Sequence, residues 1–226
     1  MQPRHILAGI YQVGGSGLSG SGDCMCYAVD CGQSEVVLID CGVDAKGKIL
    51  ANITAVGMDT ANLKHIFLTH THIDHTGAAA AFQEEFPDAT FYAHELEVPA
   101  IEGAPGTAKL TAASWYGIEY IPIKIQHIIQ GEAEDILIGD LEFHCVHIPG
   151  HTVGSMAIYV DVEGQRVLFG QDVHGPVMAE FGSNPRDYQA SLRKLLALDA
   201  DILCEGHHGI MVGKSEVQAF IKDYLR

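Results

Sequence analysis

Four short apolar segments of this sequence run directly into a turn that carries histidine or aspartate. They have the length and the Val, Ile, Leu and Phe content of strands that are buried on both faces. The segments are residues 65–68, 141–148, 166–169 and 201–204. Because ligand sites in α/β proteins form at the carboxyl ends of strands, we expect the side chains of these four turns to gather at one edge of the sheets.

Helices are expected around these strands. Asn184-Pro185 is a helix-start pair, and the spacing of Ser215 and Gln218 is that of a capping box. Strands mixed with helices predict an α/β layered protein, which we expect to form a single domain over residues 1–226. The expected helices span residues 46–56, 76–86, 186–198 and a last helix from 215 that carries an apolar stripe of Val217, Phe220, Ile221 and Tyr224.

Charge and composition narrow the class of partner. Lys and Arg number 13 against 29 Asp and Glu, which gives a formal net charge of −16. Such a surface repels phosphate, so we expect a small-molecule substrate and no nucleic acid. No apolar run of about 18 residues and no signal-peptide core is visible, so we expect a cytoplasmic protein without a membrane partner. The six cysteines are expected to be reduced thiols, and the oligomeric state stays open.

The string from His70 to His75 is the strongest functional signal. It places three histidines and one aspartate within six residues, directly after a predicted strand. A helix would not turn all four side chains to one face, whereas a loop that leaves a strand can. Neutral imidazole and carboxylate suit zinc, iron or manganese. The candidate ligands are His70, His72, Asp74 and His75, with His151, Asp172 and His207 from the other three turns and His208 as an alternative to His207.

The segment from Asp40-Cys41-Gly42 to His207 resembles the metallo-β-lactamase superfamily. That resemblance implies an αββα sandwich, in which two mixed β-sheets are flanked by helices. The run Pro149 to Ser155 is similar to the glyoxalase II-type branch, without that branch's C-terminal glutathione-binding helical domain, because only 19 residues follow His207. The resemblance implies a first metal held by His70, His72 and His151, a second held by Asp74, His75 and His207, and Asp172 as a bridge.

The function expected from this resemblance is metal-dependent hydrolysis. Two divalent ions, zinc first and iron or manganese as alternatives, would supply a metal-bound hydroxide that attacks the carbonyl of a thioester, lactone or other ester. Asp74 is the candidate catalytic residue, which orients or moves a proton. One alternative is a sulfur oxygenase that resembles the persulfide dioxygenases, with a single iron on His70, His151 and Asp172. The other is a non-catalytic metal-bearing protein that binds a ligand.

Several further residues have candidate roles near such a site. An insertion at about 98–130 is expected beside the substrate pocket, with Trp115 and Tyr116 as part of its wall or as local packing. Asp40 either supports a metal-binding histidine or caps a turn. His174 is expected to face the pocket or to be structural, and the alternation of a strand predicts that His144 and His147 face opposite sides.

Overall fold

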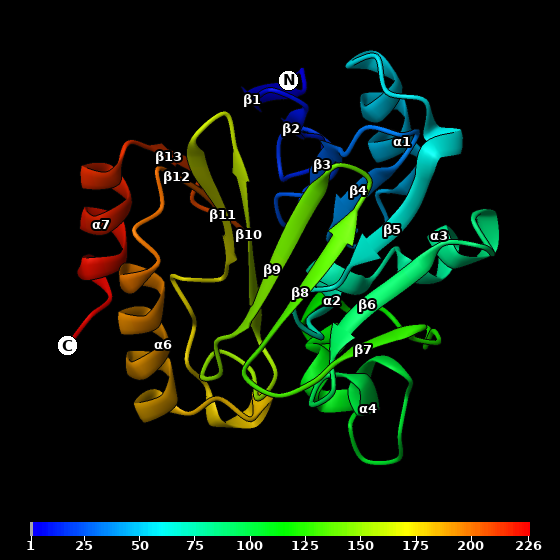
Figure 1. The fold of residues 1–226 in the computed structure, drawn as a ribbon. Coiled ribbons are helices and arrows are strands. Elements are labelled where there is room, and N and C mark those ends of the chain that lie inside the picture. The colour runs from blue at the N-terminus through cyan, green and yellow to red at the C-terminus, as the bar shows by residue number, and fades with distance from the viewer. Residues whose placement is uncertain (1) are drawn as a thin grey trace.

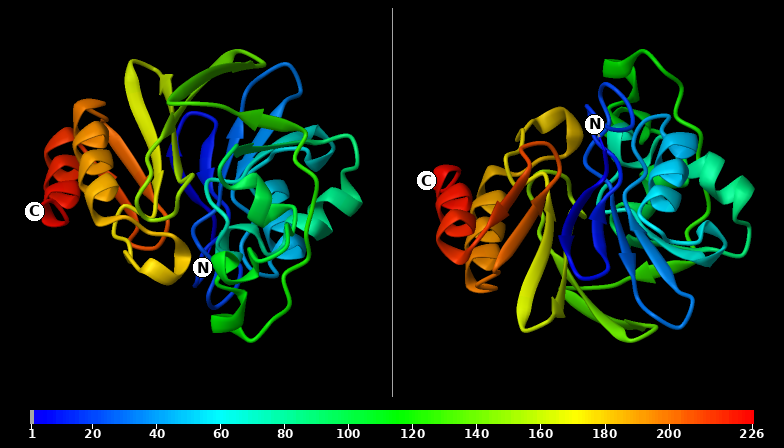
Figure 2. Two further views of the ribbon diagram at one scale, coloured as in Figure 1. Left: turned by 90° about the horizontal axis from the view of Figure 1, so that it is seen from below. Right: turned by 90° about the horizontal axis from the view of Figure 1, so that it is seen from above.

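A computed structural model describes residues 2–226 of the chain, in which two β-sheets pack face to face (Figure 1). Helices cover the outer face of each sheet, and the two outer layers lie on opposite sides of the molecule in both views of Figure 2. The predicted αββα sandwich with two mixed sheets is therefore confirmed.

The first sheet has seven strands whose spatial order follows the chain order. The pairs from β1 to β4 are antiparallel and the pairs from β4 to β7 are parallel. The carboxyl ends of β4 to β7 consequently meet at one edge. The strands are β1 (Arg4–Leu7), β2 (Ile10–Gln12), β3 (Tyr27–Asp30), β4 (Val36–Ile39), β5 (Leu63–Phe67), β6 (Thr90–His94) and β7 (His127–Ile129).

The second sheet has six strands in the order β13-β12-β11-β10-β9-β8. Its β11 and β12 are parallel neighbours and its other pairs are antiparallel, so the sheet is mixed. The strands are β8 (Ala133–Ile138), β9 (Leu141–His147), β10 (Met156–Val162), β11 (Gln165–Gln171), β12 (Ile202–Glu205) and β13 (Ile210–Val212).

The central core lies between the sheets. Phe67 of the first sheet stacks on Phe143 of the second at 5.6 Å and on Tyr92 at 4.3 Å. Burial of such large rings supplies much of the hydrophobic free energy that joins the two sheets. Outside the sheets lie α1 (Lys46–Ala55), η1 (Thr60–Asn62), α2 (Ile73–Thr76), α3 (Ala79–Glu85), α4 (Val98–Ile101), η2 (Ala108–Thr111), α5 (Ala113–Tyr116), η3 (Ala179–Phe181), α6 (Pro185–Ala197) and α7 (Lys214–Asp223).

Two details of the predicted helices are wrong. The helix expected over 76–86 is interrupted, because the Ala78 amide donates to Gly42 O while Asp74 O accepts from the Cys24 amide. The capping box at Ser215 does not form, since α7 begins one residue earlier with Gly213 as its N-cap and no side-chain cap.

Other local predictions hold. The Asn184 side chain caps α6 by accepting from the amides of Arg186 and Asp187. In the stripe of the last helix, Val217 and Ile221 are buried. The six cysteines are buried and free. Among residues 2–226, no helix combines the length and the apolar character that crossing a membrane requires.

Candidate metal centre

Loops that follow four strands bring the candidate ligands to one edge of the sandwich. The segment after β5 supplies four of them, partly as loop and partly as the short helix α2. The turn between β9 and β10 supplies one, and the ends of β11 and β12 supply one each. The structure gathers all seven predicted residues into two neighbouring groups that share Asp172, namely His70, His72, His151, Asp74, His75, Asp172 and His207.

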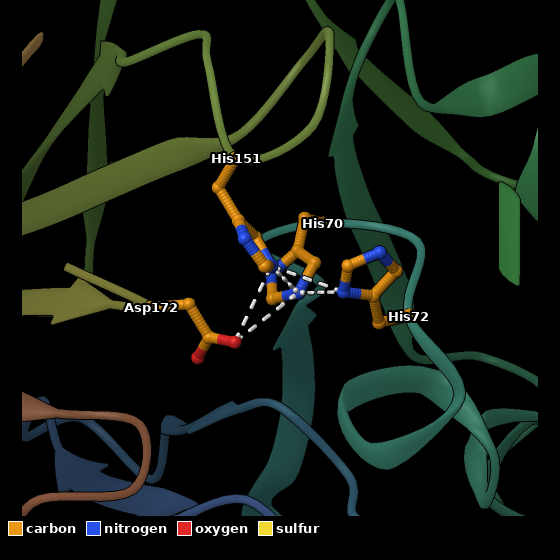
Figure 3. A group of neighbouring side chains, drawn as sticks. All are labelled: His70, His72, His151 and Asp172. Atoms are coloured by element: carbon orange, nitrogen blue, oxygen red, sulfur yellow. Dashed lines mark hydrogen bonds and ion pairs between the residues drawn. The ribbon is translucent and has the colours of Figure 1, made fainter. Parts of the chain in front are cut away.

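The first group consists of three buried histidines and one oxygen of Asp172. Figure 3 shows the four side chains pointing toward one another. His72 Nδ1 lies 3.1 Å from His70 Nε2 and 3.0 Å from His151 Nε2, and the His70 and His151 atoms are 3.3 Å apart. Asp172 Oδ2 is 3.3 Å from His151 Nε2. Three imidazole nitrogens and a carboxylate oxygen therefore face a common point.

The second group lies on the other side of Asp172. Asp172 Oδ1 is 3.2 Å from His75 Nε2 and 3.5 Å from His207 Nε2. The His207 atom is also 3.1 Å from Asp74 Oδ2. Asp172 thus presents one carboxylate oxygen to each group.

Hydrogen bonds on the far sides of two rings fix which nitrogen faces the centre. His75 Nδ1 donates to Asp40 Oδ2 at 2.7 Å, and His151 Nδ1 donates to Pro176 O at 2.8 Å, because both partners can only accept. In the neutral form of each ring, Nε2 therefore faces the centre with a free lone pair, which is the form that binds a metal. Asp40 also accepts from the amide and the hydroxyl of Thr69, so it supports a histidine of the group and ties down the loop.

Burial and charge set the ionisation of the centre. Burial, reinforced by the neighbouring imidazoles, lowers the pKa of His70 well below its usual value and that of His72 to about 3. Burial opposes protonation of His75, but the carboxylates of Asp172, Asp40 and Asp74 raise its pKa well above the usual value. Without a metal, these carboxylates therefore favour a proton on His75 Nε2, and the positive charge of the ring offsets part of their negative charge. A bound cation would take that place.

The donor set fits divalent metal ions. The buried atoms His75 Nε2 and Asp172 Oδ1 face the centre 3.2 Å apart, and neither has a further hydrogen-bond partner in the described chain. In a tetrahedral site with bonds of about 2.0–2.1 Å, neighbouring ligand atoms lie about 3.3 Å apart. In the first group the three imidazole nitrogens lie 3.0 to 3.3 Å from one another, and Asp172 Oδ2 lies 3.3 Å from His151 Nε2 and 3.9 Å from His70 Nε2. Nitrogen and carboxylate oxygen are ligands of zinc, iron and manganese alike.

Two other histidines near the second group make different contacts. His208 lies outside both groups and packs against His174 at 4.6 Å and Phe220 at 6.0 Å between ring centres. His174 lies at the rim, with its Nδ1 2.7 Å from Glu205 Oε1 and its ring 5.3 Å from that of His207. The geometry therefore favours His207 over His208 as a ligand.

The remaining candidates lie outside the centre or already have partners. His144 pairs with Asp135, and His147 stacks on His94 at 4.0 Å, so each has a structural partner. Cys24 lies near Asp40 and His75, but those two side chains already bind each other.

Aromatic residues flank the centre on both sides. The ring of Trp115 lies 4.8 Å from that of Phe181, which in turn lies 4.9 Å from His72. Tyr116, the next residue of α5, borders Gly22. Burial together with the carboxylates of Asp74 and Asp172 raises the pKa of its phenol, which stays a hydrogen-bond donor at neutral pH. Trp115 is 57% exposed and Tyr116 40% exposed, so both rings remain open to a ligand.

Three residues at the centre were missed from the sequence. Glu205 accepts from the amides of His207 and His208 at 2.7 and 2.8 Å, and its position beside Gly206 in the ligand turn was an available signal. Glu97 and Phe181 lie far from any ligand in the sequence, and no local pattern marks them.

Known proteins resemble this chain in sequence and in fold. The profile of the metallo-beta-lactamase superfamily matches residues 19–207. A probable metallo-hydrolase, YflN of Bacillus subtilis, is 28% identical over 207 residues, which cover 79% of this chain and 77% of the relative. The hydroxyacylglutathione hydrolase GloC of Haemophilus influenzae is 29% identical over 186 residues, covering 78% and 81%. A metallo-beta-lactamase structure from Cronobacter sakazakii has a TM-score of 0.81 at 18% identity, covering 99% of this chain and 94% of the other.

Proposed function

Because this chain belongs to the metallo-β-lactamase superfamily, we propose that it is a hydrolase that uses two divalent metal ions to cleave a small carbonyl substrate. The substrate class is a thioester, a lactone or another ester. The observation that carries the proposal is the position of Asp172, whose two oxygens face two separate groups of ligand atoms.

The proposed ligand sets follow those two groups. His70, His72 and His151 would hold the first ion, Asp74, His75 and His207 would hold the second, and Asp172 could contribute one oxygen to each set. Zinc is the proposed metal. Bound there, zinc would lower the pKa of a coordinated water to about 7 and would polarise a substrate carbonyl.

The protein's own residues orient the reaction. Asp40 and the Pro176 carbonyl hold the lone pairs of His75 and His151 toward the centre. Asp74 lies at the edge of the second group, where its Oδ2 is 3.1 Å from His207 Nε2. Its carboxylate orients the attacking water and passes the proton to the leaving group.

The aromatic residues of α5 form the proposed substrate wall. Trp115 borders the first group through Phe181, and Tyr116 borders the second group beside Asp74. A substrate that lies across both groups therefore meets an apolar surface and a phenol donor. These side chains suit an uncharged acyl group next to the scissile carbonyl.

Metal content and turnover test the proposal together. We expect the protein to bind two equivalents of zinc and to hydrolyse members of a panel of thioesters, lactones and other esters. A single-stranded RNA oligonucleotide, tested in parallel, should not be cleaved. Asp74→Asn should lower kcat by about 100-fold or more, since general acid–base groups contribute roughly 10²- to 10⁴-fold. Asp88→Asn, the same change at an exposed site, should leave kcat unchanged.

Three results would contradict the proposal. The first is an inactive panel at two bound zinc ions per chain, and the second is full activity in Asp74→Asn. The third is one bound iron per chain with oxygen uptake on a persulfide substrate, which is the behaviour of the oxygenase alternative.

A further inference from the structure

Glu97 is a buried carboxylate that belongs to neither ligand group. It follows β6 as the N-cap residue of α4 and is 1% exposed. Burial raises the pKa of its carboxyl group, and the partners of that group are two amides and one hydroxyl. Burying a carboxylate without a cationic partner is costly, so its hydrogen bonds need an explanation.

Those hydrogen bonds join two loops that carry ligands. Glu97 Oε2 accepts from the amide of Thr71 at 2.8 Å, and Thr71 lies between His70 and His72. Glu97 Oε1 accepts from the hydroxyl of Thr152 at 2.7 Å, and Thr152 directly follows His151. The first loop leaves the first sheet and the second loop belongs to the second sheet. One carboxylate therefore spans the two sheets at the level of the first ligand group.

The second loop is shaped to admit this carboxylate. The amide of Gly154 also donates to Glu97 Oε1, at 2.6 Å. A Cβ atom at Gly154 would lie 2.9 Å from Glu97 Cγ and 3.0 Å from Oε1, closer than packed atoms tolerate. Thr152 is held in turn by Ser155, whose Oγ is 2.7 Å from Thr152 Oγ1. These contacts leave the carboxylate little freedom.

We propose that Glu97 is a positioning residue that sets the distance between His151 and the His70–His72 pair, and thereby the affinity of the first ligand group for its metal ion. The mechanism acts through the backbone. The carboxylate fixes Thr71 between two ligands and Thr152 next to the third, so the three rings converge before a metal binds. Outer hydrogen bonds of this kind change metal affinity by about 10- to 100-fold when they are removed.

Glu97→Gln is the variant that separates this role from packing. The side chain keeps its size, but its amide nitrogen cannot accept. In one orientation of the glutamine side chain the NH₂ group faces the Thr71 amide, and in the other it faces the Gly154 amide, so one backbone donor loses its acceptor in either case. Glu95→Gln is the matched control, because Glu95 lies two residues earlier, is exposed and also accepts a backbone amide, that of Gly131 at 3.1 Å.

Bound zinc per chain, measured across a series of metal-buffered solutions, is the readout. For Glu97→Gln we expect one of the two binding steps to move to about 10- to 100-fold higher free zinc, while Glu95→Gln matches the wild type. In a His207→Ala background, which retains the first ligand group, Glu97→Gln should shift the remaining step. If Glu97→Gln does not fold, Thr152→Val removes one of the three donors and should shift the same step by a smaller factor.

The inference rests on the proposed metal binding but not on the substrate. Wild-type protein that binds no zinc would refute the proposed function. Wild-type binding with both steps unchanged in Glu97→Gln, or shifted equally, would overturn the role of Glu97 alone. A purely structural carboxylate would lower the urea midpoint of the metal-free protein and leave both zinc affinities as they are.

Discussion

Replacement of Asp40 by asparagine should reverse the tautomer of one metal-binding histidine. Asp40 is fully buried, and its Oδ2 accepts from His75 Nδ1 at 2.7 Å and from Thr69 Oγ1 at 2.8 Å. An asparagine NH₂ group in that place cannot accept. The Thr69 hydroxyl can turn and accept instead, but His75 must move its proton to Nε2 to keep a hydrogen bond. Its lone pair then faces away from Asp172.

Asparagine isolates this effect from backbone strain. Asp40 has φ of 61°, a left-handed conformation that asparagine adopts as readily as aspartate, whereas alanine would add strain. We expect Asp40→Asn to lower the affinity of the second ligand group for zinc by about 10- to 100-fold. The loss of a charged, buried hydrogen bond should also lower the free energy of unfolding of the metal-free protein by about 1.5–3 kcal/mol.

The chain provides a matched control for this change. Asp135 Oδ1 lies 2.7 Å from His144 Nδ1, the same pair at the same distance, but the Asp135 side chain is 60% exposed. Asp135→Asn should therefore change stability by less than about 1 kcal/mol and leave zinc binding unaltered. Zinc titrations give the affinity, and ¹⁵N shifts of the His75 ring in the zinc-loaded protein show which ring nitrogen carries the proton. Unchanged zinc affinity in Asp40→Asn, with the proton still on Nδ1 of the zinc-loaded protein, would refute the reasoning.

Three further predictions concern the centre and its surroundings. Removal of metal with a chelator should lower the unfolding midpoint and leave the far-ultraviolet circular dichroism unchanged. The reason is that a ligand at 1,000 times its Kd adds about 4 kcal/mol to the free energy of unfolding. A midpoint that does not move would mean that the folded state holds no metal. Gly150→Ala should lower the free energy of unfolding in urea by more than about 3 kcal/mol, because its φ is 133° and a Cβ atom would overlap the Tyr188 backbone. Gly164→Ala has open space around its Cβ position and should lower the free energy of unfolding by about 1 kcal/mol. Equal losses in the two variants would count against the packing argument. Trp115→Ala should raise KM by about 5- to 30-fold for substrates with an apolar acyl group, because about 1–2 kcal/mol of apolar contact is lost. Tyr116→Phe should lower kcat instead. If neither variant changes KM or kcat, α5 is not part of the substrate wall.

The α/β class and the ligand cluster could be predicted from local signals, whereas the αββα sandwich followed from the resemblance to the metallo-β-lactamase superfamily. An apolar run of strand length followed by histidine or aspartate shows where a strand ends. In an α/β protein the carboxyl ends of the strands form the edge at which ligands bind, so the side chains of four such ends are expected to meet there. The resemblance favoured His207 over His208, because His207 directly follows Gly206, and the structure adds that His208 lies outside both ligand groups. The interruption before α3 depends on Gly42 and Cys24, which are distant in sequence from the helix they interrupt.

Glu97 could not be predicted because its partners are distant in sequence. They lie 26 and 55 positions away, in loops that belong to different sheets. Its own neighbours in the sequence, Glu95 and Pro99, give the appearance of an exposed helix start. A buried carboxylate of this kind is visible only when the sheets are assembled, since burial and hydrogen bonding are properties of the packed state.

Glu97 and Glu205 lie at opposite ends of the metal centre and satisfy the same physical requirement. Rings that share a ligand site must converge although their lone pairs repel one another without a cation, so the backbone has to be held by something other than the metal. Glu97 holds the first ligand group across the two sheets. Glu205 holds the second within one sheet, by accepting from the amide of His207 and from the ring of His174. Both carboxylates are buried, and their hydrogen bonds offset part of that cost. The loops are therefore ordered by the protein before a metal binds, which is why removal of the metal is expected to lower the unfolding midpoint without unfolding the chain.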